Sequence, residues 1–310
     1  ARDFNGESRI DLAIACHRDS RVAVLSGLRL EALAEDPAGS GLRSGYGRGN
    51  AANRDDYDHW SFHADEGDWL TVASETPGSP GESQLLYEIW QPNGSRLTYF
   101  YPDYNGRGQC SPVRIPVSGR YAVSVRYHYD YQSEYRVRVT LARPALQPET
   151  EDNNNTDQAN LINWTEDSRH LRATRAGYIG LNDGSGDYTW LGNLTGGTAI
   201  QTGLRRPSTS GLQAVIGIYR GSALVTNSAA GAAAFTYTIP EGADGLYYVR
   251  VTADGGTLGL LSQYLLDLDL YDTRPPAVVE VTLPAEGVST NLLVDRFQIV
   301  FSEEMMVTAV

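Results

Sequence analysis

SGRYAVSVRYHYDYQSEYRVRVTL, residues 118–141, alternates apolar and polar side chains in two arms on either side of a polar break. From Tyr121 to Tyr131 and again from Tyr135 to Leu141, the odd positions are Tyr, Val or Leu. Strict period-two alternation is typical of β-strands that bury one face. The stretch therefore predicts a β-hairpin with a buried odd face, while its even positions, which include Arg136 and Arg138, carry exposed charge.

The same pattern returns at residues 245–271, GLYYVRVTADGGTLGLLSQYLLDLDLY. An Ile-Pro dipeptide precedes each copy, at residues 115–116 and at residues 239–240. Repetition at roughly 120 residues is too long for a solenoid and suits successive domains. We expect an all-β chain with one module at residues 28–143 and a second at residues 144–272.

Composition limits the classes of function. The 310 residues include 32 Gly and 19 Tyr, which favours strands joined by turns. The formal charge of −13 argues against a nucleic-acid partner, whose binding needs a basic surface. Every basic residue is Arg, which excludes lysine-based covalent chemistry, and neither a G-x-S-x-G nor an H-E-x-x-H motif occurs. No apolar run approaches the ~18 residues of a membrane span. We expect a non-catalytic protein without such a span.

Three motifs occur in both modules: DYDHW and DYTW, the aliphatic-aromatic pairs of EIW and GIY, and G-x-Y-x-V-x-V. On these motifs the modules resemble the bacterial pre-peptidase C-terminal domain, a jelly-roll-like β-sandwich of secreted proteases and surface proteins. The resemblance covers about 75 % of the chain and concerns structural positions. It implies two tandem jelly-roll-like β-sandwiches in an extracellular or cell-surface bacterial protein.

The two ends of the chain predict partial β elements. DFNGESRIDL, residues 3–12, is similar to the D-F-N-G-D-G-x-x-D-L motif of FG-GAP and VCBS repeats, which implies an incomplete strand pair at residues 1–27. Residues 273–310 are similar to the start of a bacterial immunoglobulin-like domain. We expect a segment of a longer secreted polypeptide. Neighbouring domains of that chain, or identical subunits through β-strand addition, would complete both ends.

PETEDNNN, residues 148–155, concentrates oxygen ligands at the junction of the modules. Calcium takes six to eight such oxygens, and in the resembled family a linker E-x-E-x-N-(D/N) with two later Asp residues holds calcium. The predicted metal ligands are Glu149, Glu151, Asn153, Asn154, Asp183 and Asp187. The alternative is a solvated acidic linker without a metal.

A second, weaker calcium site is predicted near the N-terminus, where oxygen-bearing side chains occupy alternate positions. Its ligands would be Asp3, Asn5, Glu7 and Asp11, although Glu7 and Ser8 stand where FG-GAP repeats have Asp-Gly. In the first module, the acidic residues Asp55, Asp56 and Asp58 are interpreted as a solvated turn.

Tyr99, Tyr101 and Tyr104 lie around a predicted turn in TYFYPDYNG, residues 98–106. If exposed, they could stack on sugars or grip a fibrous protein, and the alternative is packing with only the hydroxyl in solvent. Cys16 and Cys110 are too few for a disulfide framework, and whether they pair is open.

These observations predict a calcium-stiffened spacer of a large bacterial surface or secreted protein, in which calcium fixes the angle between the modules. A filament or surface layer of identical subunits is an extension of that function. The alternative is an adhesive module of a secreted hydrolase that binds polysaccharide or fibrous protein.

Overall fold

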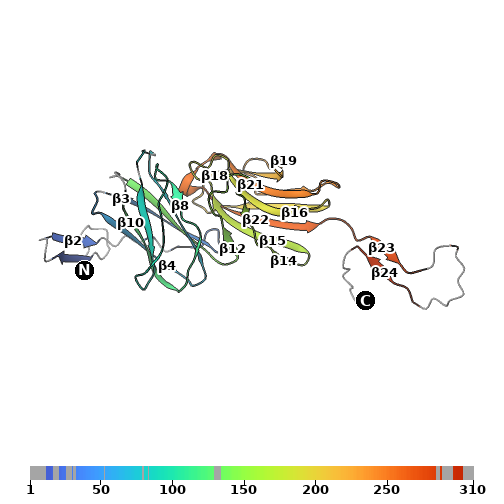
Figure 1. Ribbon diagram of the computed structural model, residues 1–310, viewed down its shortest axis with the longest axis horizontal. Helices are drawn as coiled ribbons and strands as arrows, with labels where there is room; N and C mark the ends of the chain where they lie inside the picture. The colour runs from blue at the N-terminus through green and yellow to red at the C-terminus, as the bar shows by residue number, and fades with distance from the viewer. Residues whose placement is uncertain are drawn as a thin grey trace.

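The computed structural model describes residues 12–16, 21–25, 30, 33–51, 53–78, 80–82, 84–128, 134–283, 287 and 296–302. These residues form β-strands and one 3-10 turn, η1 (Gly259–Leu261), and they contain no α-helix. Figure 1 shows two β-sandwiches next to each other along the long axis. The all-β prediction is confirmed.

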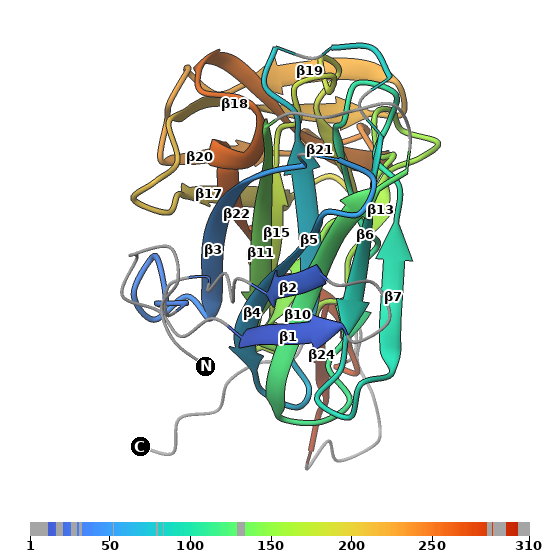
Figure 2. The same ribbon diagram turned by 90° about the vertical axis from the view of Figure 1, so that its left-hand side faces the viewer.

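The first sandwich consists of one sheet in the order β4-β10-β6-β7 and a second in the order β3-β11-β5-β8, with β9 also paired to β5. Figure 2 views it from the N-terminal side, where β6 and β7 run next to each other. Its strands are β3 (Leu42–Asn50), β4 (Tyr57–Ala64), β5 (Trp69–Glu75), β6 (Leu85–Trp90), β7 (Arg96–Phe100), β8 (Gly108–Gln109), β9 (Val113–Arg114), β10 (Gly119–Tyr127) and β11 (Glu134–Ala142).

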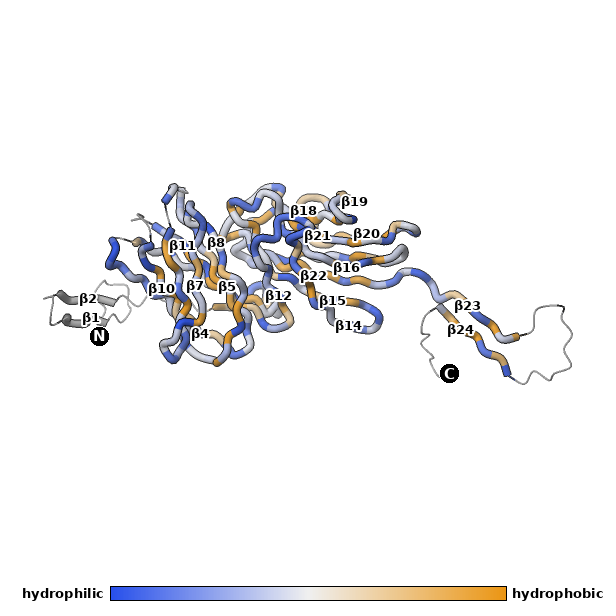
Figure 3. Tube along the Cα trace, viewed as in Figure 1, coloured by the Kyte–Doolittle hydropathy of each residue, from blue (hydrophilic) through white to orange (hydrophobic). Residues whose placement is uncertain are grey.

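The second sandwich has one sheet in the order β12-β15-β22-β17-β20, with β14 paired to β15, and another in the order β13-β16-β21-β18-β19. Its strands are β12 (Leu146–Pro148), β13 (Asn160–Leu161), β14 (Thr165–Asp167), β15 (His170–Tyr178), β16 (Asp187–Leu194), β17 (Thr198–Arg205), β18 (Leu212–Arg220), β19 (Ala223–Asn227), β20 (Ala234–Thr238), β21 (Gly245–Gly256) and β22 (Gln263–Asp272). Figure 3 shows hydrophobic stretches along the strands of both sandwiches, where each pair of sheets encloses its own core.

The same side-chain hydrogen bond occurs at corresponding positions in each sandwich. The hydroxyl of Tyr121 donates to the carbonyl oxygen of Val117 at 2.8 Å, and that of Tyr247 donates to the carbonyl oxygen of Ala243 at 2.7 Å. In both cases the acceptor lies four residues before the tyrosine, at the turn that leads into the strand. The repeated sequence therefore specifies the same local structure twice.

The stretch at residues 118–141 is not a hairpin, and this prediction was wrong. β10 pairs with β4 and β6, whereas β11 pairs with β3 and β5 in the opposite sheet. The same separation holds for β21 and β22. The odd positions of both arms that are buried in one core, from opposite sides of it, are Tyr121, Val123 and Val125 in β10 and Tyr135, Val137, Val139 and Leu141 in β11. Tyr127 is only half-buried, and Tyr129 and Tyr131 lie outside the described residues. Alternation of apolar and polar residues predicts which face of a strand is buried, but it does not predict which strand pairs with it.

The two sandwiches also pack against each other, which the sequence analysis did not predict. Arg138, an even position of β11, is 1 % exposed and donates to the carbonyl oxygen of Leu260 at 2.9 Å. Its guanidinium lies 4.3 Å from the ring centroid of Tyr178. Gln263 of β22 donates to Thr140 of β11 at 3.0 Å. The expected exposed charge at Arg138 is therefore buried between the sandwiches.

Apolar side chains from both sandwiches complete this interface. One buried cluster consists of Leu42 and Ala142 from the first sandwich with Leu146, Ala176 and Leu265 from the second. Where the sandwiches meet, outward-facing residues of β11 and β22 are thus buried in a shared interface. The relative orientation of the sandwiches is held by a packed interface in addition to the linker.

Two strand pairs lie outside the sandwiches. β1 (Leu12–Cys16) pairs with β2 (Arg21–Leu25), and β23 (Val278–Val281) pairs with β24 (Ile299–Phe301), both antiparallel. Cys110 is a free, buried thiol whose Sγ accepts the amide of Val72 at 3.2 Å, so it does not form the disulfide considered above.

Candidate metal centre

The linker between the sandwiches delivers its acidic side chains into the interior of the second sandwich. β12 runs parallel to β15, and the amide of Glu149, the next residue, donates to the carbonyl oxygen of Ala176 at 2.9 Å. The chain then crosses to β16, where the amide of Tyr188 donates to the carbonyl oxygen of Asn153 at 3.0 Å. Residues 149–153 are therefore fixed between the two sheets.

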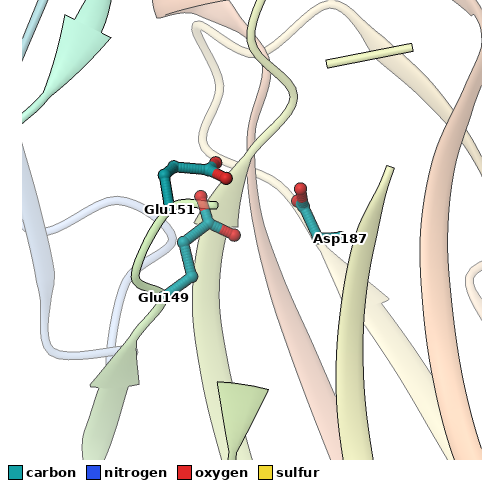
Figure 4. A group of neighbouring side chains, drawn as sticks. All are labelled: Glu149, Glu151 and Asp187. Atoms are coloured by element: carbon teal, nitrogen blue, oxygen red, sulfur yellow. The ribbon is translucent and has the colours of Figure 1, made fainter. Parts of the chain in front are cut away.

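Three carboxylates converge there. One oxygen each from Glu149, Glu151 and Asp187 lies within 4.8 Å of the others. Figure 4 shows Glu149 and Glu151 extending from the linker, with Asp187 coming from the start of β16. Glu149 is 1 % exposed and Asp187 is 3 % exposed. Water screens such buried charges poorly, so their repulsion is strong unless a positive charge lies between them.

Several buried oxygens in this cluster have no hydrogen-bond partner. They are Oδ1 of Asn153, Oδ1 of Asp187 and both carboxylate oxygens of Asp183. A buried polar group that stays unpartnered costs about 1–3 kcal/mol, and more when the group is charged. Each of these unpartnered oxygens can only accept a hydrogen bond when the carboxylates are ionised. The partner that each of them lacks is therefore a hydrogen-bond donor or a cation.

The donors that are present serve only part of the cluster. The amide of Tyr178 donates to Oε1 of Glu149 at 2.7 Å, and the hydroxyl of Tyr264 donates to Oδ2 of Asp187 at 2.5 Å. Arg175 is buried next to the linker, but its Nη atoms donate to the carbonyl oxygens of Pro148 and Leu161. These contacts orient the carboxylates and leave acceptors unused.

The protonation equilibria reflect this crowding. Burial raises the pKa of Glu149 to about 7. Burial and the charges of Glu149 and Asp183 raise the pKa of Glu151 to about 9. Burial, with Glu149 as the next cause, raises the pKa of Asp187 well above its usual value. A cation bound among these groups would favour their ionised forms, because it supplies the opposite charge that the cluster lacks.

The structure brings three of the six predicted ligands together, Glu149, Glu151 and Asp187. The charge of Asp183 acts on all three of these carboxylates, and Asn153 carries a buried oxygen without a hydrogen-bond partner. The sixth, Asn154, points its Oδ1 to the hydroxyl of Ser185 at 3.0 Å. All of these atoms are oxygens, a ligand set that suits a hard divalent cation and not a soft transition metal. The buried acidic group can therefore hold a metal ion.

Sequence reasoning missed two residues of this centre. Tyr264 lies more than seventy positions after Asp187 in the sequence and reaches it only through the sandwich fold. Gly177 lies beside both, since a Cβ atom there would stand 2.2 Å from Oε2 of Glu149 and 2.5 Å from the ring of Tyr264. The Gly177–Tyr264 pairing across β15 and β22 is a long-range contact that no local motif reports.

The other predicted sites fall in different places. Asp3, Asn5, Glu7 and Asp11 lie outside the described residues. Tyr99, Tyr101 and Tyr104 are 49 %, 46 % and 51 % exposed. The rings of Tyr99 and Tyr101 meet edge to face at 5.8 Å, and the hydroxyl of Tyr104 donates to Glu82 at 2.7 Å.

No protein-family model matches the chain, and no curated protein sequence matches it. Among solved structures, it is similar to the pre-peptidase C-terminal domain of a collagenase from Bacillus anthracis, at 11 % identity and a TM-score of 0.27, over 37 % of this chain and 94 % of that one. PliG of Aeromonas hydrophila, a periplasmic inhibitor of g-type lysozyme, matches at 15 % identity and a TM-score of 0.25, over 37 % and 99 %.

A third similar structure is ZmpB of Clostridium perfringens, comprising its M60 catalytic domain with two CBM51 domains. It matches at 9 % identity and a TM-score of 0.24, over 75 % of this chain and 34 % of that one. Identities and TM-scores this low carry no conclusion about what the chain does. In the described part of the chain, no helix has the length and apolar character needed to cross a bilayer.

Proposed function

We propose that this chain is a non-catalytic spacer of an extracellular bacterial protein, stiffened by calcium at the linker between two pre-peptidase-C-terminal-like sandwiches. The observation that carries the proposal is the set of buried oxygens without partners on Asn153, Asp183 and Asp187, next to the carboxylates of Glu149 and Glu151. In this proposal residues 1–27 belong to an FG-GAP-like or VCBS-like repeat, and residues 273–310 begin an immunoglobulin-like domain.

Calcium fits this ligand set better than magnesium. Calcium accepts six to eight oxygens in a flexible geometry, and two or more carboxylates with an amide oxygen are typical of its sites. Magnesium demands a nearly ideal octahedron and tends to keep several waters. A centre that is almost fully buried at Glu149 and Asp187 leaves little room for those waters.

The cation would act as a fastener within the spacer. Glu149 and Glu151 belong to the linker, whereas Asp187 begins a strand of the second sandwich. A cation that binds all three ties the linker to that strand. The linker follows directly on β12, whose Leu146 packs in the interface with the first sandwich. Calcium and the packed interface would together hold the two sandwiches as one rigid rod.

Thermal unfolding in calcium and in chelator tests the proposal. We expect calcium to raise the midpoint of unfolding, magnesium to raise it less, and glutamyl endopeptidase, a serine protease that needs no catalytic metal, to cut residues 149–155 faster in chelator. Asp183→Asn should remove most of the calcium effect, because Asp183 holds two of the unpartnered oxygens. Asp152→Asn is the matched control, since Asp152 is exposed on the same loop. An unchanged midpoint and unchanged cutting in calcium would refute the metal centre.

A second candidate function is adhesion through the three tyrosines of the first sandwich. The observation that favours it is their exposure, with Tyr99 on β7 and the other two on the loop that follows. Exposed tyrosines on a rigid sheet offer contact area at a low entropic cost. Pull-down on chitin, cellulose and collagen with wild type and a Tyr99→Ala, Tyr101→Ala double variant tests it. Equal retention of the two proteins would remove the candidate.

A third proposal concerns assembly through the terminal strands. Figure 1 shows β23 and β24 standing apart from the sandwiches, and Val279 and Phe297 of this segment are largely exposed. A two-stranded sheet alone is marginally stable in water. Further strands, from neighbouring domains or from identical subunits, would complete it by β-strand addition. A monomeric mass by light scattering over a wide concentration range would argue against identical subunits.

A further inference from the structure

The interface between the sandwiches leaves a pocket at each end of β5. Both ends of this strand line a pocket: Trp69 belongs to one of 610 Å³ and Glu75 to one of 290 Å³. Seven residues of strand separate the pockets by about 20 Å. The smaller pocket adjoins the candidate metal centre, because Glu151 and Asp183 line it. The larger one, here called the interdomain cleft, is lined by none of the predicted metal ligands.

The two pockets carry opposite charge. The smaller pocket is lined by five carboxylates and one guanidinium: Glu75, Asp103, Glu151, Asp152, Asp183 and Arg107. Among the described residues that line the interdomain cleft, none is acidic, and two are basic, namely Arg114 and Arg175. In a chain with a formal charge of −13, a cleft of this size without a carboxylate is a local excess of positive charge. It therefore attracts an anionic group.

Arg114 is available to such a group. Arg114 is exposed, its guanidinium lies 4.9 Å from the ring centroid of Trp69, and it forms no ion pair within the described part of the chain. Arg175 is 4 % exposed and its Nη atoms already donate to the carbonyl oxygens of Pro148 and Leu161, so it contributes positive charge to the cleft wall and not a direct contact. Arginine is the side chain best suited to bind a carboxylate through two parallel hydrogen bonds.

Two tryptophans supply apolar walls from opposite sides. Trp69 packs against the interface cluster from the first sandwich, and Trp164 packs against the core of the second. Both are only partly buried, and Leu161 at the same cleft is 71 % exposed. Asn163 and Thr165 add hydrogen-bonding side chains to the lining. The cleft exists only because the two sandwiches dock, since each contributes one wall.

We propose that the interdomain cleft binds an acidic saccharide, with a sugar ring against a tryptophan and its carboxylate on Arg114. Its 610 Å³ lies within the range of small-molecule sites, which is about 300–1,000 Å³. Sugar rings present apolar C–H faces to aromatic rings and hydroxyls to amides and hydroxyls, which matches this mixed lining. The strongly acidic chain disfavours a polyphosphate such as nucleic acid, whose many charges would be repelled. One carboxylate per sugar needs only the local positive charge of the cleft.

Calorimetric titration of the full chain at a fixed free calcium concentration tests this inference. The probes are trigalacturonate and tetrasaccharides of hyaluronan and chondroitin, with neutral chitotetraose and a tetraglutamate peptide as comparisons. We expect at least one acidic saccharide to bind, and to bind more weakly as salt is raised. Absence of binding by all three acidic saccharides, or equal binding by chitotetraose or tetraglutamate, would overturn the proposal.

Two variants assign the binding to the cleft. Arg114→Gln removes the carboxylate partner and Leu161→Asp places a negative charge in the cleft, and each should lower affinity by about tenfold. Both side chains are exposed, so the melting temperature should stay unchanged. Arg120→Gln, at an exposed arginine of β10, is the matched control. Affinity that is unaffected by both cleft variants would place the binding elsewhere and refute the assignment.

The metal centre and the cleft can fail independently. Asp183 lines the other pocket, so Asp183→Asn should remove most of the calcium effect and retain saccharide binding. Loss of saccharide binding in that variant, with the cleft variants behaving like wild type, would contradict the inference and leave the proposed spacer function in place.

Discussion

The two sandwiches contain the same buried tyrosine in two different surroundings. Tyr135 of β11 and Tyr264 of β22 hold equivalent positions, and each is almost fully buried. Each faces a glycine on the neighbouring strand, Gly49 or Gly177. A Cβ atom at either glycine would come within 2.5 Å of the tyrosine ring. The two tyrosines are therefore equivalent in burial and in their facing glycine, and they differ in the groups that surround the hydroxyl.

Each tyrosine hydroxyl donates to an aspartate at 2.5 Å, Asp58 in the first sandwich and Asp187 in the second. Asp58 lies opposite Val125 and Asp187 opposite Val251, which are corresponding residues of β10 and β21. The shared sequence motif aligns Asp187 with Asp56, the start of DYDHW and two residues before Asp58, and predicts a solvated turn at Asp58. The fold instead puts Asp58 against a buried hydroxyl.

What surrounds this pair differs between the sandwiches. In the first, Nε1 of Trp60 donates to the hydroxyl of Tyr135 at 2.9 Å, and that hydroxyl donates to Asp58. The Tyr135 hydroxyl therefore has both a donor and an acceptor partner. In the second, Oε2 of Glu149 lies 3.2 Å from the hydroxyl of Tyr264. One hydroxyl proton cannot serve two carboxylates.

The comparison gives a reason why, among the described residues, acidic side chains gather into a candidate metal centre in the second sandwich and not in the first. The same Tyr-Asp pair is balanced by a neutral indole in one case, and it is overloaded with acidic side chains in the other. A cation is the simplest group that balances the second site, because it neutralises several carboxylates and satisfies their free oxygens together.

The largest expected difference comes from removing one acidic group at each site. Glu149→Gln should abolish stabilisation by calcium, a loss of about 4 kcal/mol when calcium stands 1,000-fold above its dissociation constant. Asp58→Asn should cost about 1–3 kcal/mol, the same in calcium and in chelator, because only a hydrogen bond weakens. Urea unfolding of both variants in the two buffers measures this. A calcium-dependent effect of Asp58→Asn would break the comparison.

An intermediate difference is expected from the paired glycines. Gly49→Ala and Gly177→Ala should each cost about 1–3 kcal/mol through overpacking against the tyrosine. Only Gly177→Ala should also weaken calcium binding, since its new methyl group meets Oε2 of Glu149. Calcium titration followed by calorimetry separates the two variants. Equal calcium affinity in both would show that Glu149 is not a ligand.

The smallest difference is expected from the indole that balances the first site. Trp60→Phe keeps most of the packing and removes the N–H donor to Tyr135, which should cost about 1 kcal/mol. The loss should be independent of calcium. Trp190→Phe is the control in the second sandwich, because Trp190 is a half-buried tryptophan of β16, two residues after Tyr188. If Trp60→Phe left the free energy of unfolding unchanged, the indole N–H would contribute nothing to the first site, and the comparison between the indole and the cation would fail.

Much of the candidate centre could be predicted because its residues are close in sequence. Glu149, Glu151 and Asn153 lie on one short linker, and alternate positions of an extended chain point the same way. Asp183 and Asp187 lie just before and at the start of one strand. Tyr264 could not be found in this way, because it lies on β22 and meets Asp187 of β16 only where the two sheets of the sandwich pack face to face.

Arg138 shows the limit of alternation most directly. Its position on the outward face of β11 follows from the sequence, and outward positions of a sandwich normally meet water. Here the outward face of β11 meets β22 of the other sandwich, so the guanidinium is buried against Leu260 and Tyr178. An interface between domains depends on the shapes of both surfaces, which no single strand encodes.

For this protein, the sequence by itself determined that the chain is all-β, which face of the repeated strands points into the core of its own sandwich, and where acidic ligands are concentrated. These properties depend on the backbone pleat and on neighbouring residues, and both are local. The tertiary structure alone decided that the two arms of residues 118–141 join opposite sheets, that the sandwiches dock, and that a cleft with two arginines lies between them. Those features depend on contacts between distant residues, where many pairings share the same local pattern and packing selects one.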